Sequence, residues 1–220
     1  MSNERKTKIG LICNVWDDPE GVERILNQPT IFGFDYLIFI DGQFSNYKGE
    51  CEYGLNDVRD CVELYKSIYK SIPIYYENVE GLTEAEKRDY SFKVAMKLGM
   101  DFALVCDADE IPYINREEFD SEVESLLQAE WGCYAIMLDN YKLEQRRPRL
   151  FDLREKPYLL QEHKTGSHSH IYSELDGRDM AVDITECLYT VSSITLKHNK
   201  EFYSKYRFDC RHEYGLVPNH

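Results

Sequence analysis

The sequence lacks a hydrophobic run of the length that a membrane span requires. No stretch approaches the roughly 18 consecutive apolar residues of a transmembrane helix. Residues 1–6 are mostly polar or charged, and no apolar signal-peptide core follows them. We therefore expect a cytoplasmic protein without integral membrane association.

Paired cysteines are also missing. The seven cysteines are an odd number, and none of them forms a C-x-x-C pair. This usage argues against a disulfide framework or a zinc ribbon. Cys13, Cys106 and Cys133 lie in or beside apolar runs, so we expect reduced thiols in the core.

Positive charge is scarce: 26 Lys and Arg stand against 40 Asp and Glu, for a net charge of −14. Residues 1–140 hold 13 basic against 28 acidic side chains, whereas residues 141–220 hold 13 against 12. An acidic surface repels nucleic acid and anionic membranes at long range, so an anionic partner is expected to approach through the C-terminal third. An acidity that serves only solubility explains the numbers equally well.

Internal repeats and low-complexity linkers are absent as well. The length of 220 residues and the 43% hydrophobic content suit a globular chain with a substantial core. Residues 1–220 are therefore expected to form a single domain.

Apolar runs alternate with amphipathic segments through the first half of the chain. This order predicts an α/β protein with a mostly parallel sheet and helices on both faces. Asp18 with Pro19 is expected to begin the first helix, and Thr83 with Glu86 has the spacing of a capping box. Strands are expected over residues 8–14, 36–41, 72–76, 102–106 and 133–138, with helices from residue 18, over 56–69, over 83–99 and over 116–129.

The segment beyond Asp139 has weaker patterns. They predict a mixed extension of the sheet and a terminal helix. Short strands are expected over residues 149–152, 158–161, 168–173 and 188–196, and the final helix over 200–213.

Two aspartates follow the apolar strand 102–106 directly. Ligands gather at the carboxyl ends of such strands in open α/β sheets. Asp107 and Asp109 are spaced i, i+2, a spacing that faces the same way in a strand. Paired carboxylates suit a hard divalent cation that shares its coordination with substrate phosphates. The alternative is a pair of solvated residues at a strand end.

Asp41 ends the second strand, and Lys87 and Arg88 stand early in the helix 83–99. A carboxylate at a strand end can accept hydrogen bonds from a nucleotide, although an ordinary aspartate at the start of a loop is an equal alternative. Cations near a helix start oppose its dipole. Their position therefore indicates a task such as phosphate binding, with a solvated charged face as an equal alternative.

These features together resemble a family 2 glycosyltransferase of the GT-A fold, the Rossmann-like fold of nucleotide-diphospho-sugar transferases. The resemblance covers residues 8–140 and extends more loosely through Pro148–Phe151 and Leu196–His198. It is carried by Asn14-Val15-Trp16-Asp17, by Phe39-Ile40-Asp41-Gly42 with Ser45, by Glu86-Lys87-Arg88 and by the run from Leu104 to Glu110.

The resemblance implies a site for a nucleotide-sugar donor, in the first instance a UDP-sugar, together with Mn²⁺ or Mg²⁺. Residues 8–140 would bind the donor, and residues 141–220 would form the acceptor side. Asp107 and Asp109 would bind the metal ion, with His198 as a further ligand. The nucleotide contacts would come from Asn14, Trp16, Asp41, Lys87, Arg88 and Asp107.

The catalytic base is not marked by a clear motif. An inverting transfer needs a carboxylate or imidazole within reach of the acceptor hydroxyl. Glu174 is the first candidate for that base, followed by Asp139 and Asp183. His163, His168 and His170 form a cluster. These histidines either lie solvated on a surface strand or act as metal ligands. The basic run 146–149 meets either donor phosphates or an anionic acceptor, or forms a solvated face.

The predicted function is that of a metal-dependent glycosyltransferase of the hexosyltransferase type, which moves a sugar to an acceptor hydroxyl with inversion. The acceptor is a glycan, a protein or another hydroxyl compound, and the net charge disfavours a modified DNA base. One alternative is a non-catalytic protein that binds nucleotide sugars. Another is a phosphotransferase of the haloacid-dehalogenase type, which normally carries its Asp-x-Asp on the first strand, whereas here it follows the fourth.

Overall fold

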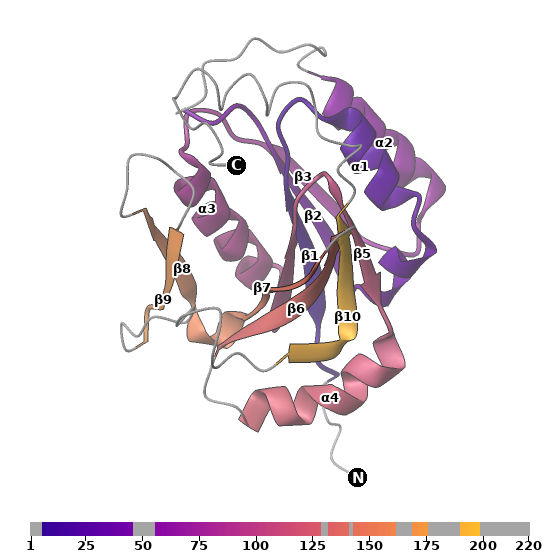
Figure 1. Ribbon diagram of the computed structural model, residues 1–220. Helices are drawn as coiled ribbons and strands as arrows, with labels where there is room; N and C mark the ends of the chain where they lie inside the picture. Colours follow the sequence, from indigo (N-terminus) through magenta and orange to yellow (C-terminus); the bar gives the residue numbers. More distant parts are fainter. Residues whose placement is uncertain are drawn as a thin grey trace.

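Strands and helices alternate through the first half of the chain (Figure 1). The computed structural model describes residues 6–45, 56–128, 132–140, 143–161, 169–175 and 190–198. The order of the elements is the predicted one, with an additional 3₁₀ helix after α1. They are β1 (Ile9–Asn14), α1 (Pro19–Leu26), η1 (Pro29–Gly33), β2 (Tyr36–Asp41), α2 (Asp57–Ile68), β3 (Ile74–Asn78), α3 (Glu84–Lys97) and β4 (Phe102–Cys106).

The second half contains more strand than the sequence predicts. β5 was not expected, because it begins with a charged residue and contains Pro112, which is tolerated mainly at sheet edges. β7 begins at Leu143 and not at residue 149. The final helix predicted over 200–213 lies outside the described residues. The elements are β5 (Glu110–Ile114), α4 (Arg116–Gln128), β6 (Cys133–Asn140), β7 (Leu143–Asp152), η2 (Leu153–Glu155), β8 (Pro157–Gln161), β9 (Ser169–Ser173) and β10 (Thr190–His198).

The main sheet has the strand order β3-β2-β1-β4-β7-β6-β10-β5, and β8 pairs with β9 in a separate two-stranded sheet. β3, β2, β1 and β4 run parallel to one another. β7 pairs antiparallel with both β4 and β6, and β10 runs parallel to β6 but antiparallel to β5. The predicted α/β class is therefore confirmed. The carboxyl ends of the four parallel strands meet at one edge of the sheet, named the C-terminal edge below.

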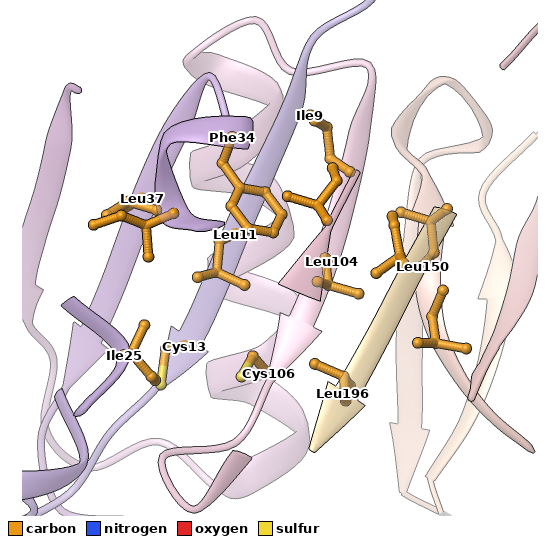
Figure 2. Close-up of a cluster of buried hydrophobic side chains, with 14 of the residues drawn as sticks. Ile9, Leu11, Cys13, Ile25, Phe34, Leu37, Leu104, Cys106, Leu150 and Leu196 are labelled. Atoms are coloured by element: carbon orange, nitrogen blue, oxygen red, sulfur yellow. The ribbon is translucent and has the colours of Figure 1, made fainter. Parts of the chain in front are cut away.

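Alternate residues of the parallel strands face opposite layers of helices. Leu11 and Leu104 belong to a buried cluster with side chains of α1, α2 and α4, and Figure 2 shows part of this cluster. Ile12 and Val105 belong to a second cluster with side chains of α3. Figure 1 shows α3 on one side of the sheet and α1 with α2 on the other. Each fully buried aliphatic side chain contributes about 1.5–3 kcal/mol, so both faces of the sheet are held firmly.

Two helix starts follow the predicted capping chemistry. The side chain of Asp18 accepts a hydrogen bond from the amide of Gly21 at 2.7 Å, and Pro19 is the first residue of α1. Thr83 and Glu86 form the capping box of α3, with the Thr83 amide donating to Glu86 at 2.8 Å. Since α1 follows β1 and α3 follows β3, both helices begin at the C-terminal edge.

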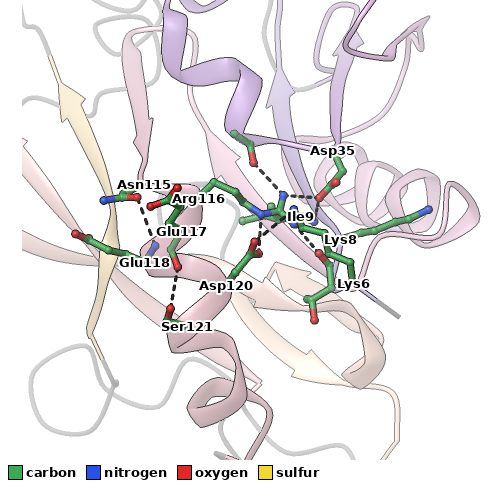
Figure 3. Close-up of polar contacts among 12 residues, drawn as sticks. Lys6, Lys8, Ile9, Asp35, Asn115, Arg116, Glu117, Glu118, Asp120 and Ser121 are labelled. Atoms are coloured by element: carbon green, nitrogen blue, oxygen red, sulfur yellow. Dashed lines mark hydrogen bonds and ion pairs between the residues drawn. The ribbon is translucent and has the colours of Figure 1, made fainter. Parts of the chain in front are cut away.

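At the opposite edge of the sheet, where the parallel strands begin, one arginine of α4 binds several neighbouring groups (Figure 3). Arg116 pairs with Asp35 and with Asp120, each at 2.7 Å. It also donates to the carbonyl oxygen of Thr7 at 2.8 Å, while Asp35 accepts from the amide of Ile9 at 2.9 Å. This network joins α4 to the starts of β1 and β2, far from the C-terminal edge.

Among the described residues, no helix combines the length and the apolar character needed to cross a bilayer. Cys13, Cys106 and Cys133 are buried and are not joined in disulfides, as predicted.

Candidate functional site

Asp107 and Asp109 lie in a tight turn between β4 and β5. The strand does not continue through them, so the i, i+2 argument for a shared strand face does not apply. The amide of Glu110 donates to the carbonyl oxygen of Asp107 at 2.9 Å, and the amide of Asp107 donates to the carboxylate of Glu110, also at 2.9 Å. The turn is therefore closed by Glu110, the first residue of β5.

Two arginines hold the carboxylate of Asp107. Nη2 of Arg149 lies 2.6 Å from Oδ2 and 2.7 Å from Oε1 of Glu110. Nη2 of Arg88 lies 3.4 Å from Oδ1 and 3.0 Å from the carboxylate of Glu84. Arg149 comes from β7, which pairs antiparallel with β4. Because β7 lies beside β4, the guanidinium group of Arg149 reaches the end of β4.

Burial dominates the electrostatics of this cluster. The side chain of Glu110 is 2% exposed, and burial raises its pKa to about 7, against the opposing effect of Arg149. Burial alone would lower the pKa of Arg149, but the carboxylates of Asp107 and Glu110 outweigh that effect and raise it. The arginine is therefore a permanent positive charge between two carboxylates.

Asn14, the last residue of β1, carries an amide group with open hydrogen-bonding capacity. Its Oδ1 and Nδ2 atoms are buried and have no hydrogen-bond partner among the described residues. A buried polar group left unsatisfied costs about 1–3 kcal/mol. A ligand that meets both atoms would recover that cost, and the nucleotide contact of Asn14 stays a prediction. Trp16, the second predicted contact in this loop, is half-buried between β1 and α1.

Asp41 is engaged inside the protein. Its side chain is buried, with Oδ1 accepting from the amide of Gly42 at 2.7 Å. Oδ2 accepts from the hydroxyl of Tyr76 at 2.9 Å and from the amide of Asn78 at 3.4 Å. Asp41 therefore joins the ends of β2 and β3. Sequence reasoning missed Tyr76 and Asn78, although their position at the end of the third strand was the available signal.

Lys87 also makes its contacts inside the protein. It is fully buried, and its Nζ donates to the carbonyl oxygens of Val15 at 2.6 Å and Gly42 at 2.8 Å. The ring of Phe44 lies 4.6 Å from the same amine. Burial lowers the pKa of Lys87 to about 8. The lysine thus fixes the loops that follow β1 and β2, whereas the prediction was a contact with phosphate.

The start of α1 packs directly on the turn of Asp107 and Asp109. A Cβ atom at Gly21 would lie 2.8 Å from the carbonyl oxygen of Ala108. Burial raises the pKa of Asp18, and the charge of Asp109 is one of the weaker effects in the same direction. The two carboxylates are therefore close enough to repel each other.

The structure separates the predicted bases. Glu174 is exposed, and its amide donates to the carbonyl oxygen of Lys156, which follows η2. The amide of Leu153, the first residue of η2, donates to the carbonyl oxygen of Asp101. Since Asp101 precedes β4 and Asp107 follows it, Glu174 lies towards the end of β4 opposite Asp107, and its role as the base stays a prediction. Asp139 is exposed near the end of β6, across from Lys197 of β10. Asp183 lies outside the described residues.

The backbone of His198 ends β10 and stands across from Glu110. His198 therefore lies at the C-terminal edge, as the predicted metal ligand must, but its side chain is not among those described. Its neighbour on β6 is Asn140, which follows Asp139. Asp139 thus reaches the same edge of the sheet, unlike Glu174.

The residues present fit a divalent cation only in part. Among the described side chains, no group of three or more His, Cys, Asp or Glu is placed to hold a metal ion. Asp107 and Asp109 supply hard oxygen ligands, which Mg²⁺ and Mn²⁺ prefer, and such ions commonly use one or two carboxylates together with substrate phosphates. The site therefore suits a cation that completes its coordination with a bound diphosphate.

Comparison with models of protein families finds no match, and comparison with curated proteins finds none. Among solved structures, TarS 1–349 from S. aureus has 13% identity and a TM-score of 0.46, with 71% of this chain and 51% of that chain covered. A structure of the same TarS piece in complex with UDP-GlcNAc has 16% identity and a TM-score of 0.39, with 60% and 34% covered.

4-Diphosphocytidyl-2C-methyl-D-erythritol synthase from Anaerococcus prevotii has 13% identity and a TM-score of 0.48, with 96% of this chain and 97% of that chain covered. The chain spans about half or less of the length of the TarS structures that it matches.

Proposed function

We propose that the chain is a glycosyltransferase that moves a sugar from a nucleotide-sugar donor, in the first instance a UDP-sugar, to an acceptor hydroxyl. The observation that carries this proposal is the cluster of Asp107, Glu110, Arg88 and Arg149 at the C-terminal edge. A diphosphate is the ligand whose charge and geometry suit planar guanidinium groups beside a cation-binding carboxylate.

Asp107 and Asp109 would hold Mn²⁺ or Mg²⁺, which would neutralise charge on the departing nucleoside diphosphate. Arg88 and Arg149 would bind the diphosphate oxygens. The open amide of Asn14 would hydrogen-bond with the nucleotide, since both of its polar atoms are buried beside the end of β1. Asp41 and Lys87 would act indirectly, because they hold the backbone around this position.

In the transfer, the bond between the anomeric carbon and the diphosphate oxygen breaks, and a bond from that carbon to the acceptor oxygen forms. The proton of the acceptor passes to a carboxylate base. Asp139 is our choice for that base, because it lies at the C-terminal edge whereas Glu174 lies at the opposite one. Inversion at the anomeric carbon is part of the proposal.

The test is a panel of nucleotide sugars incubated with the protein and Mn²⁺, with release of nucleoside diphosphate measured alongside calorimetric binding of UDP. Turnover of one donor, lost in Asp109→Asn, is the expected result. Binding without turnover of any donor would favour a non-catalytic protein that binds nucleotide sugars. Absence of all nucleotide binding would overturn the proposal.

A further inference from the structure

The carboxylate of Asp107 is shared between two fixed cations. Oδ2 lies 2.6 Å from Nη2 of Arg149, and Oδ1 lies 3.4 Å from Nη2 of Arg88. An arginine side chain keeps its proton throughout the working range of pH. A metal ion at either oxygen would therefore lie beside a positively charged guanidinium group.

Each arginine has a second carboxylate that holds it in place. Arg149 pairs with Glu110 at 2.7 Å, and Arg88 pairs with Glu84 at 3.0 Å. If a guanidinium group turns away from Asp107, it stays at the C-terminal edge and keeps a partner. Its remaining N–H groups are then available to a phosphate group, which guanidinium binds in a bidentate way.

The charges make these two events depend on each other. A divalent cation that binds alone would lie beside two positively charged guanidinium groups. The repulsion between these charges is strong because little water screens it. A diphosphate alone would meet the negative carboxylate of Asp107. The cation and the diphosphate together remove both repulsions, because the arginines exchange one anion for another.

We propose that Arg88 and Arg149 make cation binding depend on the donor: each pairs with Asp107 until the diphosphate of the donor binds its guanidinium group instead. This inference rests on the proposed function, because it assigns a regulation to the same site. Coupling between two ligands is reciprocal. UDP should therefore raise the affinity for Mn²⁺ by the factor by which Mn²⁺ raises the affinity for UDP, with about tenfold as the expected size.

The experiment measures free Mn²⁺ by electron paramagnetic resonance during titration of the protein, with and without UDP. The wild-type protein should bind Mn²⁺ weakly alone and at least several-fold more tightly with UDP. Arg149→Gln should bind Mn²⁺ alone more tightly than the wild type and bind UDP more weakly, so that the coupling shrinks. A residue with a merely structural role would lower both affinities together.

The matched control is Arg116→Gln. Arg116 is 17% exposed and pairs with two carboxylates at 2.7 Å, and Arg149 is 14% exposed with pairs at 2.6 and 2.7 Å. Because Arg116 lies at the opposite edge of the sheet, its loss should lower stability and leave the coupling between Mn²⁺ and UDP unchanged. Arg88→Gln, at a more exposed side chain, repeats the test if Arg149→Gln does not fold.

A folded Arg149→Gln or Arg88→Gln variant that binds Mn²⁺ no more tightly than the wild type, with the coupling to UDP intact, would overturn the inference while leaving the proposed function standing. A wild-type protein that binds no UDP in the presence of Mn²⁺ would overturn both. The two failures are thus distinguished by whether UDP binds.

Discussion

Gly21 packs so closely on Ala108 that a Cβ atom at position 21 would lie 2.8 Å from the carbonyl oxygen of Ala108. The first turn of α1 therefore rests on the turn that carries Asp107 and Asp109. This contact joins a helix that follows β1 to the end of β4. The geometry of the two aspartates consequently depends on a glycine far from them in the sequence.

Gly21→Ala should move the turn of Asp107 and Asp109. The added methyl group would also lie 2.6 Å from Oδ2 of Asp18, so two neighbours must shift. We expect a loss of about 1–3 kcal/mol in the free energy of unfolding and a drop of about tenfold in the affinity for UDP with Mn²⁺, equivalent to about 1.4 kcal/mol. Urea denaturation and calorimetry measure the two effects. Glu20→Ala, an exposed neighbour in α1, serves as the control, and unaltered UDP affinity in a folded Gly21→Ala protein would contradict the prediction.

Lys87 should make stability depend on pH in a defined window. Burial lowers its pKa from 10.5 to about 8, so between these values the unfolded chain holds a proton that the folded chain has lost. The free energy of unfolding should therefore rise with pH across this window, by about 3 kcal/mol for the complete shift. The penalty for burying the charged amine is fully present below the window and absent above it.

The measurement is urea denaturation of wild type and Lys87→Met at several pH values from 7 to 10.5. The difference between the two proteins isolates the lysine, because the other titrating groups are common to both. Lys93→Met, at an exposed lysine of α3, should show no such trend. Parallel curves for wild type and Lys87→Met would show that the amine is not desolvated.

Asp109→Asn should abolish Mn²⁺-dependent binding of the donor. The substitution keeps the shape of a residue that is 6% exposed, but replaces an anionic ligand with a neutral one. We expect loss of turnover and of the effect of Mn²⁺ on UDP affinity, with far-ultraviolet circular dichroism unchanged. Asp120→Asn, at the opposite edge, should keep both properties. Full Mn²⁺ dependence in Asp109→Asn would remove this residue from the metal site.

Asp139→Asn should lower kcat by a factor of about 10²–10⁴, the usual contribution of a general base, while leaving the KM for the donor close to its wild-type value. Glu174→Gln should have the smaller effect, because Glu174 lies at the edge of the sheet opposite Asp107. Steady-state kinetics with a donor that the protein turns over distinguish Asp139 from Glu174 as the base. The reverse order of effects would restore Glu174 as the base.

Local chemistry explains which features the sequence predicted. The caps at Asp18 and Thr83 depend on residues three positions away, and both were predicted correctly. The apolar run from Phe102 to Cys106 identified a buried strand, so the placement of Asp107 at its end followed. The alternation of strands and helices through the first 106 residues likewise gave the α/β class.

Features that depend on strand pairing were not predictable in the same way. Arg149 reaches Asp107 only because β7 enters the sheet antiparallel beside β4. The hydroxyl of Tyr76 can donate a hydrogen bond to Asp41 because β3 lies next to β2. The position of Glu174 likewise depends on a contact between segments that are distant in sequence, the hydrogen bond from its amide to the carbonyl oxygen of Lys156.

The strand order also has a consequence for the sequence of folding events. Among the described strands, β5 lies at the edge of the main sheet and pairs only with β10, the last of them. The parallel strands β1–β4 can pair while later segments are still being synthesised, whereas β5 gains its partner only when β10 arrives. During synthesis Glu110, which closes the turn of Asp107, is therefore expected to reach its final environment only after β10 has emerged, later than β1 and β4.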